Sequence, residues 1–181
     1  MGVYCQMLAD EKIMKSLEGV KKALVLTCPG CACESLSYDK GLPNRSLNDG
    51  KGFENIAVAV HKERDRIKDF FSRAGIKTNT MTVAFPCELV ETDCRQIVKM
   101  AEDVDAVCVL ACTGGFLGIR DILAGCGVKI APLMRSVGTF VFHIGIDDSG
   151  NYTFVERENA RILRFSTRES GRGAGFQGNA D

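Results

Sequence analysis

Short apolar runs recur along this sequence, and segments with helical periodicity separate them. Two of these runs, at 23–27 and 106–111, show no alternation of polar and apolar residues. Strands buried on both faces have this pattern, and they occur in parallel sheets that are covered by helices. Both runs are also much shorter than the roughly 20 apolar residues that a membrane-spanning helix needs. The pattern therefore predicts an α/β fold whose strands alternate with crossover helices.

The expected elements form a single domain over 1–166. We predict helices over 10–20, 56–74, 89–102, 115–124 and 156–165, and strands over 23–27, 78–85, 106–111 and 128–131. The segments 138–146 and 151–155 flank a turn and predict an antiparallel hairpin at the edge of the sheet. The predicted fold is thus a three-layer α/β domain with a mostly parallel sheet and an antiparallel edge hairpin.

Two segments have little apolar content. The segment Ser37–Asn55 is polar and contains Gly41, Pro43, Gly50 and Gly52. It predicts a long loop that contacts a partner or closes over a site. The last residues, 167–181, are Gly-rich and predict a disordered tail.

The charge balance excludes some classes of partner. Lys and Arg number 23, and Asp and Glu also number 23, so the formal net charge is zero. Proteins that bind nucleic acids or anionic membranes through charge carry an excess of basic residues, so we expect neither kind of partner. The first residues lack the basic and apolar regions of a signal peptide, and we expect a cytoplasmic protein.

Cysteine is the unusual component, with nine residues in 181. Four of them follow predicted strands: Cys28 and Cys31 after the first, Cys87 after the second and Cys112 after the third. Because the carboxyl ends of parallel strands meet at one edge of a sheet, these four thiols should converge there. Thiolates are soft ligands, so the sequence predicts a metal site at this edge.

Four thiolates suit either tetrahedral zinc or an iron–sulfur cluster. The Cys28-x-x-Cys31 spacing is common to both, but structural zinc sites more often have a second closely spaced pair. The arrangement therefore favours a [4Fe–4S] cluster, with Zn²⁺ as the alternative. The backbone N–H groups of Gly30 and of the Thr113-Gly114-Gly115 turn would be free to donate to cluster sulfurs.

Other interpretations of the four cysteines remain open. In the first, all four are core residues that bind no ligand. In the second, Cys28 and Cys31 form a thioredoxin-like redox pair. The second interpretation is weakened because no clear amphipathic helix follows Cys31. Cys33 is an alternate ligand or a neighbour of the site, and Glu34 and Glu88 are candidate proton-handling groups.

The remaining cysteines and the two histidines are given minor roles. We expect core positions for Cys94 and Cys108, and we assign no role to Cys5 or Cys126. His61 is expected on a solvated helix face and His143 in a packing role within a strand.

A family resemblance adds to this interpretation. The segments KKALVLTCPGC, FPCE, DAVCVLAC and KIAPLMRSVGTF occur in this order. The chain between Lys12 and Phe140 thereby resembles the small cysteine-rich (MetV-like) partner subunit of bacterial methylenetetrahydrofolate reductase and the related C-terminal domain. The resemblance implies an iron–sulfur protein with Cys28, Cys31, Cys87 and Cys112 as ligands. Members of that family commonly carry a further group of cysteines near the C-terminus. This sequence departs from that pattern, because no cysteine follows Cys126, so we expect a single cluster.

The resemblance also implies a function. Such a subunit assists a flavoprotein reductase of one-carbon metabolism, typically in anaerobic organisms. We therefore expect an electron-transfer or accessory subunit whose partner is the flavoprotein methylenetetrahydrofolate reductase subunit. Two alternatives stay open: a zinc-stabilised interaction module, and an enzyme with a metal-activated thiol, for which Cys33 and Glu34 are the groups of interest.

Overall fold

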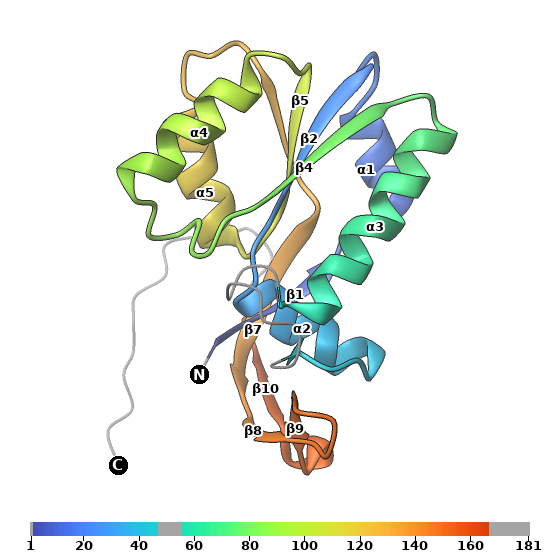
Figure 1. Ribbon diagram of the computed structural model, residues 1–181, viewed down its shortest axis with the longest axis vertical. Helices are drawn as coiled ribbons and strands as arrows, with labels where there is room; N and C mark the ends of the chain where they lie inside the picture. Colours follow the sequence, from blue (N-terminus) through green and yellow to red (C-terminus); the bar gives the residue numbers. More distant parts are fainter. Residues whose placement is uncertain (1, 47–55, 167–181) are drawn as a thin grey trace.

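A computed structural model describes residues 2–46 and 56–166, and a four-stranded parallel sheet lies at its centre (Figure 1). The strand order is β4-β2-β5-β6. All three pairings between these strands are parallel. The predicted α/β class and mostly parallel sheet are confirmed. These strands are β2 (Lys22–Thr27), β4 (Lys77–Thr82), β5 (Ala106–Leu110) and β6 (Lys129–Pro132).

Helices lie on both sides of this sheet. Figure 1 shows α1 and α3 on one side and α4 and α5 on the other. Each expected helix before residue 125 is present. Three of them are shorter than the periodicity indicated, and the one expected over 115–124 begins and ends two residues earlier. The helix over Cys31–Lys40 was not predicted. The helices are α1 (Asp10–Ser16), α2 (Cys31–Lys40), α3 (Val58–Arg73), α4 (Glu91–Ala101) and α5 (Thr113–Ile122).

The two central strands explain why the apolar runs lack alternation. Every residue of β5 is buried, and in β2 only Lys22 is exposed. Helices cover both faces of these strands, so polar residues would lose their hydration on either face without gaining a partner. Both strands therefore begin and end close to the bounds that the apolar runs predicted.

The antiparallel strands form two further sheets. One has the order β1-β7-β10 and the other the order β3-β9-β8. The predicted hairpin forms between β8 and β9, and the Asp147 carboxylate accepts N–H bonds from Ser149 and Asn151 in its turn. The hairpin pairs with β3 instead of the edge of the parallel sheet. The strands are β1 (Gly2–Met7), β3 (Arg45–Ser46), β7 (Met134–Val141), β8 (His143–Ile146), β9 (Asn151–Val155) and β10 (Arg161–Arg164).

An aromatic cluster connects these two sheets to α2. The Phe140 ring lies 5.0 Å from the Tyr38 ring and 5.7 Å from the Phe154 ring, between centroids. Tyr4 of β1 packs on Phe140 at 5.4 Å. Such contacts favour a fixed arrangement of the surrounding strands. The cluster therefore holds β1, and with it the amino-terminal segment, against α2.

Three expectations about the chain ends and the long loop need revision. The helix predicted over 156–165 is wrong, because a 3₁₀ turn at Arg157–Asn159 leads into β10, which pairs with β7. The strand β1 was not predicted at all. The loop predicted from Ser37 begins later, because α2 continues to Lys40, and residues 47–55 lie outside the described part. The predicted tail at 167–181 also lies outside it.

Among the described residues, no helix has both the length and the apolar composition needed to cross a membrane.

Candidate functional site

The carboxyl ends of β2, β4 and β5 bring the predicted cysteines to one edge of the parallel sheet. β2 and β5 are neighbours, and the Cys28 N–H donates to the Leu110 carbonyl at 3.1 Å just beyond them. The chain reaches β4 on one side of β2 and β5 on the other, so this is a topological switch point. Open α/β sheets bind ligands in the crevice at such points. Cys28 and Cys112 flank it.

The four thiols are neighbours in space. Cys31 and Cys112 lie close enough for each thiol to shift the pKa of the other. A Cβ added at Gly114 would lie 3.6 Å from Cys87 Cβ and 3.8 Å from Cys112 Sγ, which places these two cysteines on either side of one glycine. The charges of Cys112 and Cys87 both raise the pKa of Cys28. The convergence expected from the topology is therefore present in the structure.

This convergence is not the geometry of a bound ion. Within residues 2–46 and 56–166, no three His, Cys, Asp or Glu side chains are arranged so that they could hold a metal ion. The donor set is nevertheless four soft sulfurs from three separate segments, a set that suits zinc or iron–sulfur clusters. The ligand assignment stays a prediction.

Backbone N–H groups face two of the sulfurs. The Val3 N–H donates to Cys31 Sγ at 3.4 Å, and the Gly115 N–H donates to Cys112 Sγ at 3.5 Å. Cys112 is the N-cap of α5, so its sulfur lies where the helix has unpaired donors. N–H groups in these positions stabilise thiolate sulfur, whether it is free or bound to a metal.

The protonation of the thiols differs across the site. Burial raises the pKa of Cys28 to about 12. The neighbouring Cys31 thiol and the N–H groups of Gly115 and Gly114 lower the pKa of Cys112, and the pKa of Cys31 is raised in turn. The thiolate form is therefore stabilised at Cys112 and disfavoured at Cys31.

A glycine face on α5 holds the Cys87 segment in place. A Cβ at Gly118 would lie 2.2 Å from the Pro86 carbonyl oxygen, and one at Gly115 would lie 2.8 Å from Pro86 Cγ. Real side chains do not tolerate such distances, so only glycine permits this approach. The sequence TGGFLG (Thr113–Gly118) therefore permits close packing between α5 and residues 85–90, which we call the Cys87 segment.

The strand β1 brings residues to the site that sequence reasoning missed. Cys5 is fully buried; its Sγ lies 3.8 Å from Ser136 Oγ, and the Cys112 charge contributes to its raised pKa. Ser136 Oγ accepts the Thr113 N–H at 2.9 Å at the start of α5. Only the position of β1 beside α2 reveals these contacts, because the sequence near Cys5 carries no metal-ligand spacing.

Ser35 joins β1 to the start of α2. Its hydroxyl accepts the Cys5 N–H at 2.9 Å and donates to the Cys31 carbonyl at 2.8 Å, and Ser35 is fully buried. We expect Ser35→Ala to lower the free energy of unfolding by about 1–3 kcal/mol, because the buried Cys5 N–H loses its acceptor. Chemical denaturation measures this. Exposed Ser72→Ala on α3 is the control, and an equal effect of both variants would contradict the role of Ser35.

The candidate groups beside the four cysteines have other partners. Cys33 Sγ is buried and donates to the Asn44 carbonyl at 3.2 Å. Glu34 forms an ion pair with Arg45 at 3.8 Å, and burial raises the pKa of its carboxyl. A Cβ at Gly2 would lie 3.6 Å from Cys31 Sγ and 2.8 Å from a Glu34 oxygen, so Glu34 borders the thiol site. Cys33 and Glu88 also lie near predicted ligands, because their charges raise the pKa of Cys28 and of Cys87.

The other cysteines and the histidines lie elsewhere. Cys108 is fully buried within β5, and burial alone raises its pKa to about 12, as a core position requires. Cys94 is partly buried on α4, and Cys126 is exposed. His61 differs from expectation: its ring Nε2 lies 3.3 Å from Thr82 Oγ1, at the end of β4. His143 is exposed in β8, not packed.

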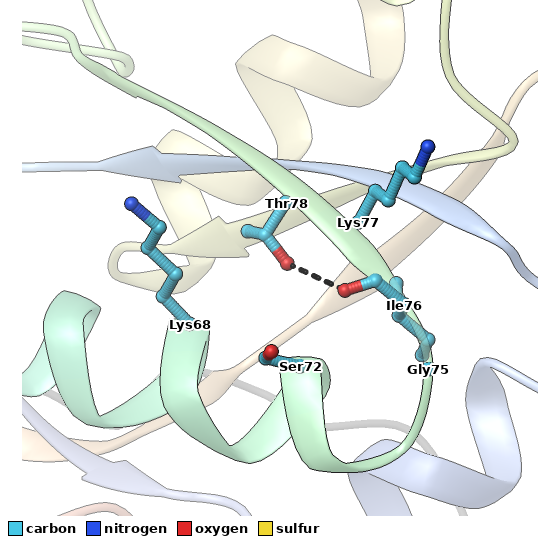
Figure 2. A pocket seen from close by; sticks show the side chains of 6 residues that line it. All are labelled: Lys68, Ser72, Gly75, Ile76, Lys77 and Thr78. Atoms are coloured by element: carbon cyan, nitrogen blue, oxygen red, sulfur yellow. Dashed lines mark hydrogen bonds between the residues drawn. The ribbon is translucent and has the colours of Figure 1, made fainter.

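The opposite end of the sheet has a separate hollow of about 270 Å³ between α3 and the start of β4. Figure 2 shows the Thr78 hydroxyl bound to the Ile76 carbonyl, while the Lys68 and Lys77 ammonium groups lie far from each other. The polar groups of this hollow do not converge on one point. The thiol site is therefore the stronger candidate.

Comparisons with known proteins leave the family open. No protein-family model matches this sequence, and neither a similar curated protein nor a similar solved structure was found.

Proposed function

We propose that Cys28, Cys31, Cys87 and Cys112 bind a [4Fe–4S] cluster and that the chain is an electron-transfer or accessory subunit. Its partner in this proposal is a flavin-dependent methylenetetrahydrofolate reductase, as the sequence resemblance implies. The observation that carries the proposal is the convergence of four thiols from three loops at the switch point of the sheet.

The environment of the sulfurs suits a cluster. The N–H groups of Val3 and Gly115 point at Cys31 and Cys112, and hydrogen bonds of this kind tune cluster potentials. When bound, such a cluster supplies one-electron transfer. Zn²⁺ would use the same four residues, and the chain would then be an interaction module without redox chemistry.

The surface beside Cys87 supports a protein partner. Cys87 is exposed, whereas Cys28 and Cys112 are only 4% and 7% exposed, so the site opens to solvent on the Cys87 side. Val90 and Leu117, which are apolar and exposed, lie on the two segments that the glycine face joins. Exposed apolar groups at the open side of a site are typical of a docking surface. Electron transfer also needs the partner close to the cluster.

Metal analysis of protein purified without oxygen tests the proposal. We expect a brown protein with four iron atoms per chain (the composition of the proposed cluster) and broad visible absorbance that bleaches on reduction. A colourless protein with one zinc ion per chain would show that the four cysteines bind zinc and not a cluster. A chain that binds neither metal under reducing conditions would overturn the site.

A surface variant tests the partner. We expect Leu117→Asp to weaken binding to the purified flavoprotein reductase by roughly tenfold or more, because a carboxylate would lose its hydration in an apolar interface. Isothermal calorimetry measures the affinity, and the metal content should not change. Exposed Leu163→Asp on β10 is the matched control. Equal binding of both variants would exclude this surface, and no binding of the unchanged chain would exclude the partner.

A further inference from the structure

The strand β1 lies beside the first turn of α2, next to one of the four predicted ligands. The backbone N–H of Val3 donates to Cys31 Sγ at 3.4 Å, although 28 positions separate the two residues in the sequence. A Cβ added at Gly2 would lie 3.6 Å from the same sulfur. Two consecutive residues of β1 therefore border the thiol site.

The two sulfurs that accept backbone N–H bonds obtain their donors in different ways. Gly115 lies three residues after Cys112, within the same helix, so the formation of α5 supplies that donor. The donor to Cys31 belongs to β1 and not to α2, which begins at Cys31. The hydrogen bond to Cys31 therefore depends on tertiary packing, because it exists only while β1 lies against α2.

Side chains of α2 hold β1 in this position. Ser35 Oγ accepts the Cys5 N–H at 2.9 Å, and the Asp39 carboxylate accepts the Tyr4 hydroxyl at 2.5 Å. β1 also pairs with β7 in antiparallel register over its whole length. The Val3 N–H is therefore a fixed donor beside the sulfur.

This N–H lies outside the ladder between β1 and β7. Each residue of an antiparallel strand directs its single N–H either toward the partner strand or away from it. The Val3 N–H is directed to Cys31, and β1 is an edge strand in the order β1-β7-β10. Proline is tolerated at edge positions whose N–H does not enter the ladder. The hydrogen bond to sulfur can thus be removed while the pairing with β7 is kept.

We propose that Val3 is a positioning residue of the thiol site, whose backbone N–H fixes the direction of the Cys31 sulfur and withdraws charge from it. This inference rests on the proposed function, because it concerns a metal that Cys31 binds. Partners that hydrogen-bond to a metal ligand orient it and tune the metal. For a cluster, such bonds to sulfur also set the reduction potential. β1 is then part of the site, in addition to its place in the antiparallel sheet.

Co²⁺ binding to the reduced, metal-free full chain tests the proposal through Val3→Pro, which lacks the N–H. Thiolate-bound Co²⁺ shows a sulfur-to-cobalt charge-transfer band in the near ultraviolet. We expect the affinity for Co²⁺ to fall by roughly tenfold or more. We also expect the band to move to longer wavelength, because a sulfur without its N–H bond gives up charge more readily. The conservative variant Val3→Ala keeps the N–H and should keep the band position.

Ser35→Ala separates this role from a merely structural one. The variant removes the acceptor of the Cys5 N–H and loosens β1, but it leaves the Val3 N–H in place. Loosening alone lowers affinity without moving the band, so we expect the move in Val3→Pro and not in Ser35→Ala. The proposal is wrong if Val3→Pro keeps the band of the unchanged chain, or if Ser35→Ala moves it equally.

A second variant applies if Val3→Pro does not fold. Cys5 allows chemical ligation of a synthetic 1–4 thioester to the chain 5–181, so an ester can replace the amide between Gly2 and Val3. This exchange removes only the N–H, and the all-amide ligation product is its control. The same move of the band is expected, and its absence would overturn the proposal.

The outcomes separate this inference from the proposed function. An unchanged chain that binds no Co²⁺ would overturn both. A chain that binds Co²⁺ with the same band in every variant would overturn this inference alone. A chain that shows the expected band shift but assembles no iron–sulfur cluster would overturn the cluster assignment and support the role of Val3.

Discussion

Gly118→Ala should displace the Cys87 segment from α5 and remove much of the bound metal. A Cβ at this position would lie 2.2 Å from the Pro86 carbonyl oxygen, and this backbone atom has no flexible end that can turn aside. Helix propensity alone would favour alanine by about 1 kcal/mol. Overpacking typically costs about 1–3 kcal/mol, and a clash with backbone lies at the upper end of that range. The clash therefore decides the sign.

The expected result is a melting temperature lowered by roughly 2–8 °C, together with a lower metal content. Gly114→Ala on the same helix is the matched control, because its Cβ would meet Cys87 and Cys112 only at 3.6 and 3.8 Å, which are ordinary contacts. Scanning calorimetry and metal analysis of both variants measure the difference. A stable, fully loaded Gly118→Ala protein would show that α5 and the Cys87 segment are not in close contact.

The sequence predicted the parallel sheet because its central strands are buried on both faces. β5 contains only apolar residues and cysteine, so its pattern fits a buried strand better than an alternating one. The positions of Cys28 and Cys112 followed directly, since strand ends in a parallel sheet share an edge. This part of the site depends on local pattern and topology, and both are visible in the sequence.

The antiparallel strands could not be predicted in the same way. β10 has the sequence Arg161–Arg164 and only one partly buried residue, so its strand conformation comes from pairing with β7. β1 likewise depends on β7, which lies more than 120 residues later in the chain (Gly2 pairs with Phe140). Pairing over such a separation leaves no local signal, and tertiary context overrides local propensity.

The sequence also could not show how closely the segments approach. The motif Thr113–Gly118 is compatible with a phosphate-binding turn or a tight turn, and its packing against Pro86 depends on the path of the Cys87 segment. The helix α2 (Cys31–Lys40) was not predicted, because its apolar residues do not form a clear stripe. A helix does follow the Cys28-x-x-Cys31 motif, but it lacks the amphipathic pattern that sequence analysis looked for there.

Cys112→Ser should abolish metal binding while leaving the fold intact. The serine hydroxyl is a hard ligand that stays protonated at neutral pH, so it does not replace a thiolate toward iron or zinc. Cys112 also neighbours the other three cysteines, because it shares Gly114 with Cys87 and its charge raises the pKa of Cys28 and Cys31. Removal of a group that only hydrogen-bonds to a metal ligand lowers metal affinity by roughly 10–100-fold, and removal of the ligand itself should lower it at least as much.

Cys108→Ser, four residues earlier on the same strand segment, is the matched control. Cys108 is fully buried, and a serine hydroxyl without a partner should cost about 1–3 kcal/mol of stability. We therefore expect opposite patterns: Cys108→Ser melts earlier with full metal content, whereas Cys112→Ser loses its metal. Metal analysis and circular dichroism of both variants distinguish them. If Cys112→Ser kept its metal, or if both variants lost it equally, Cys112 would not be a ligand, and the convergence of strand ends would serve packing alone.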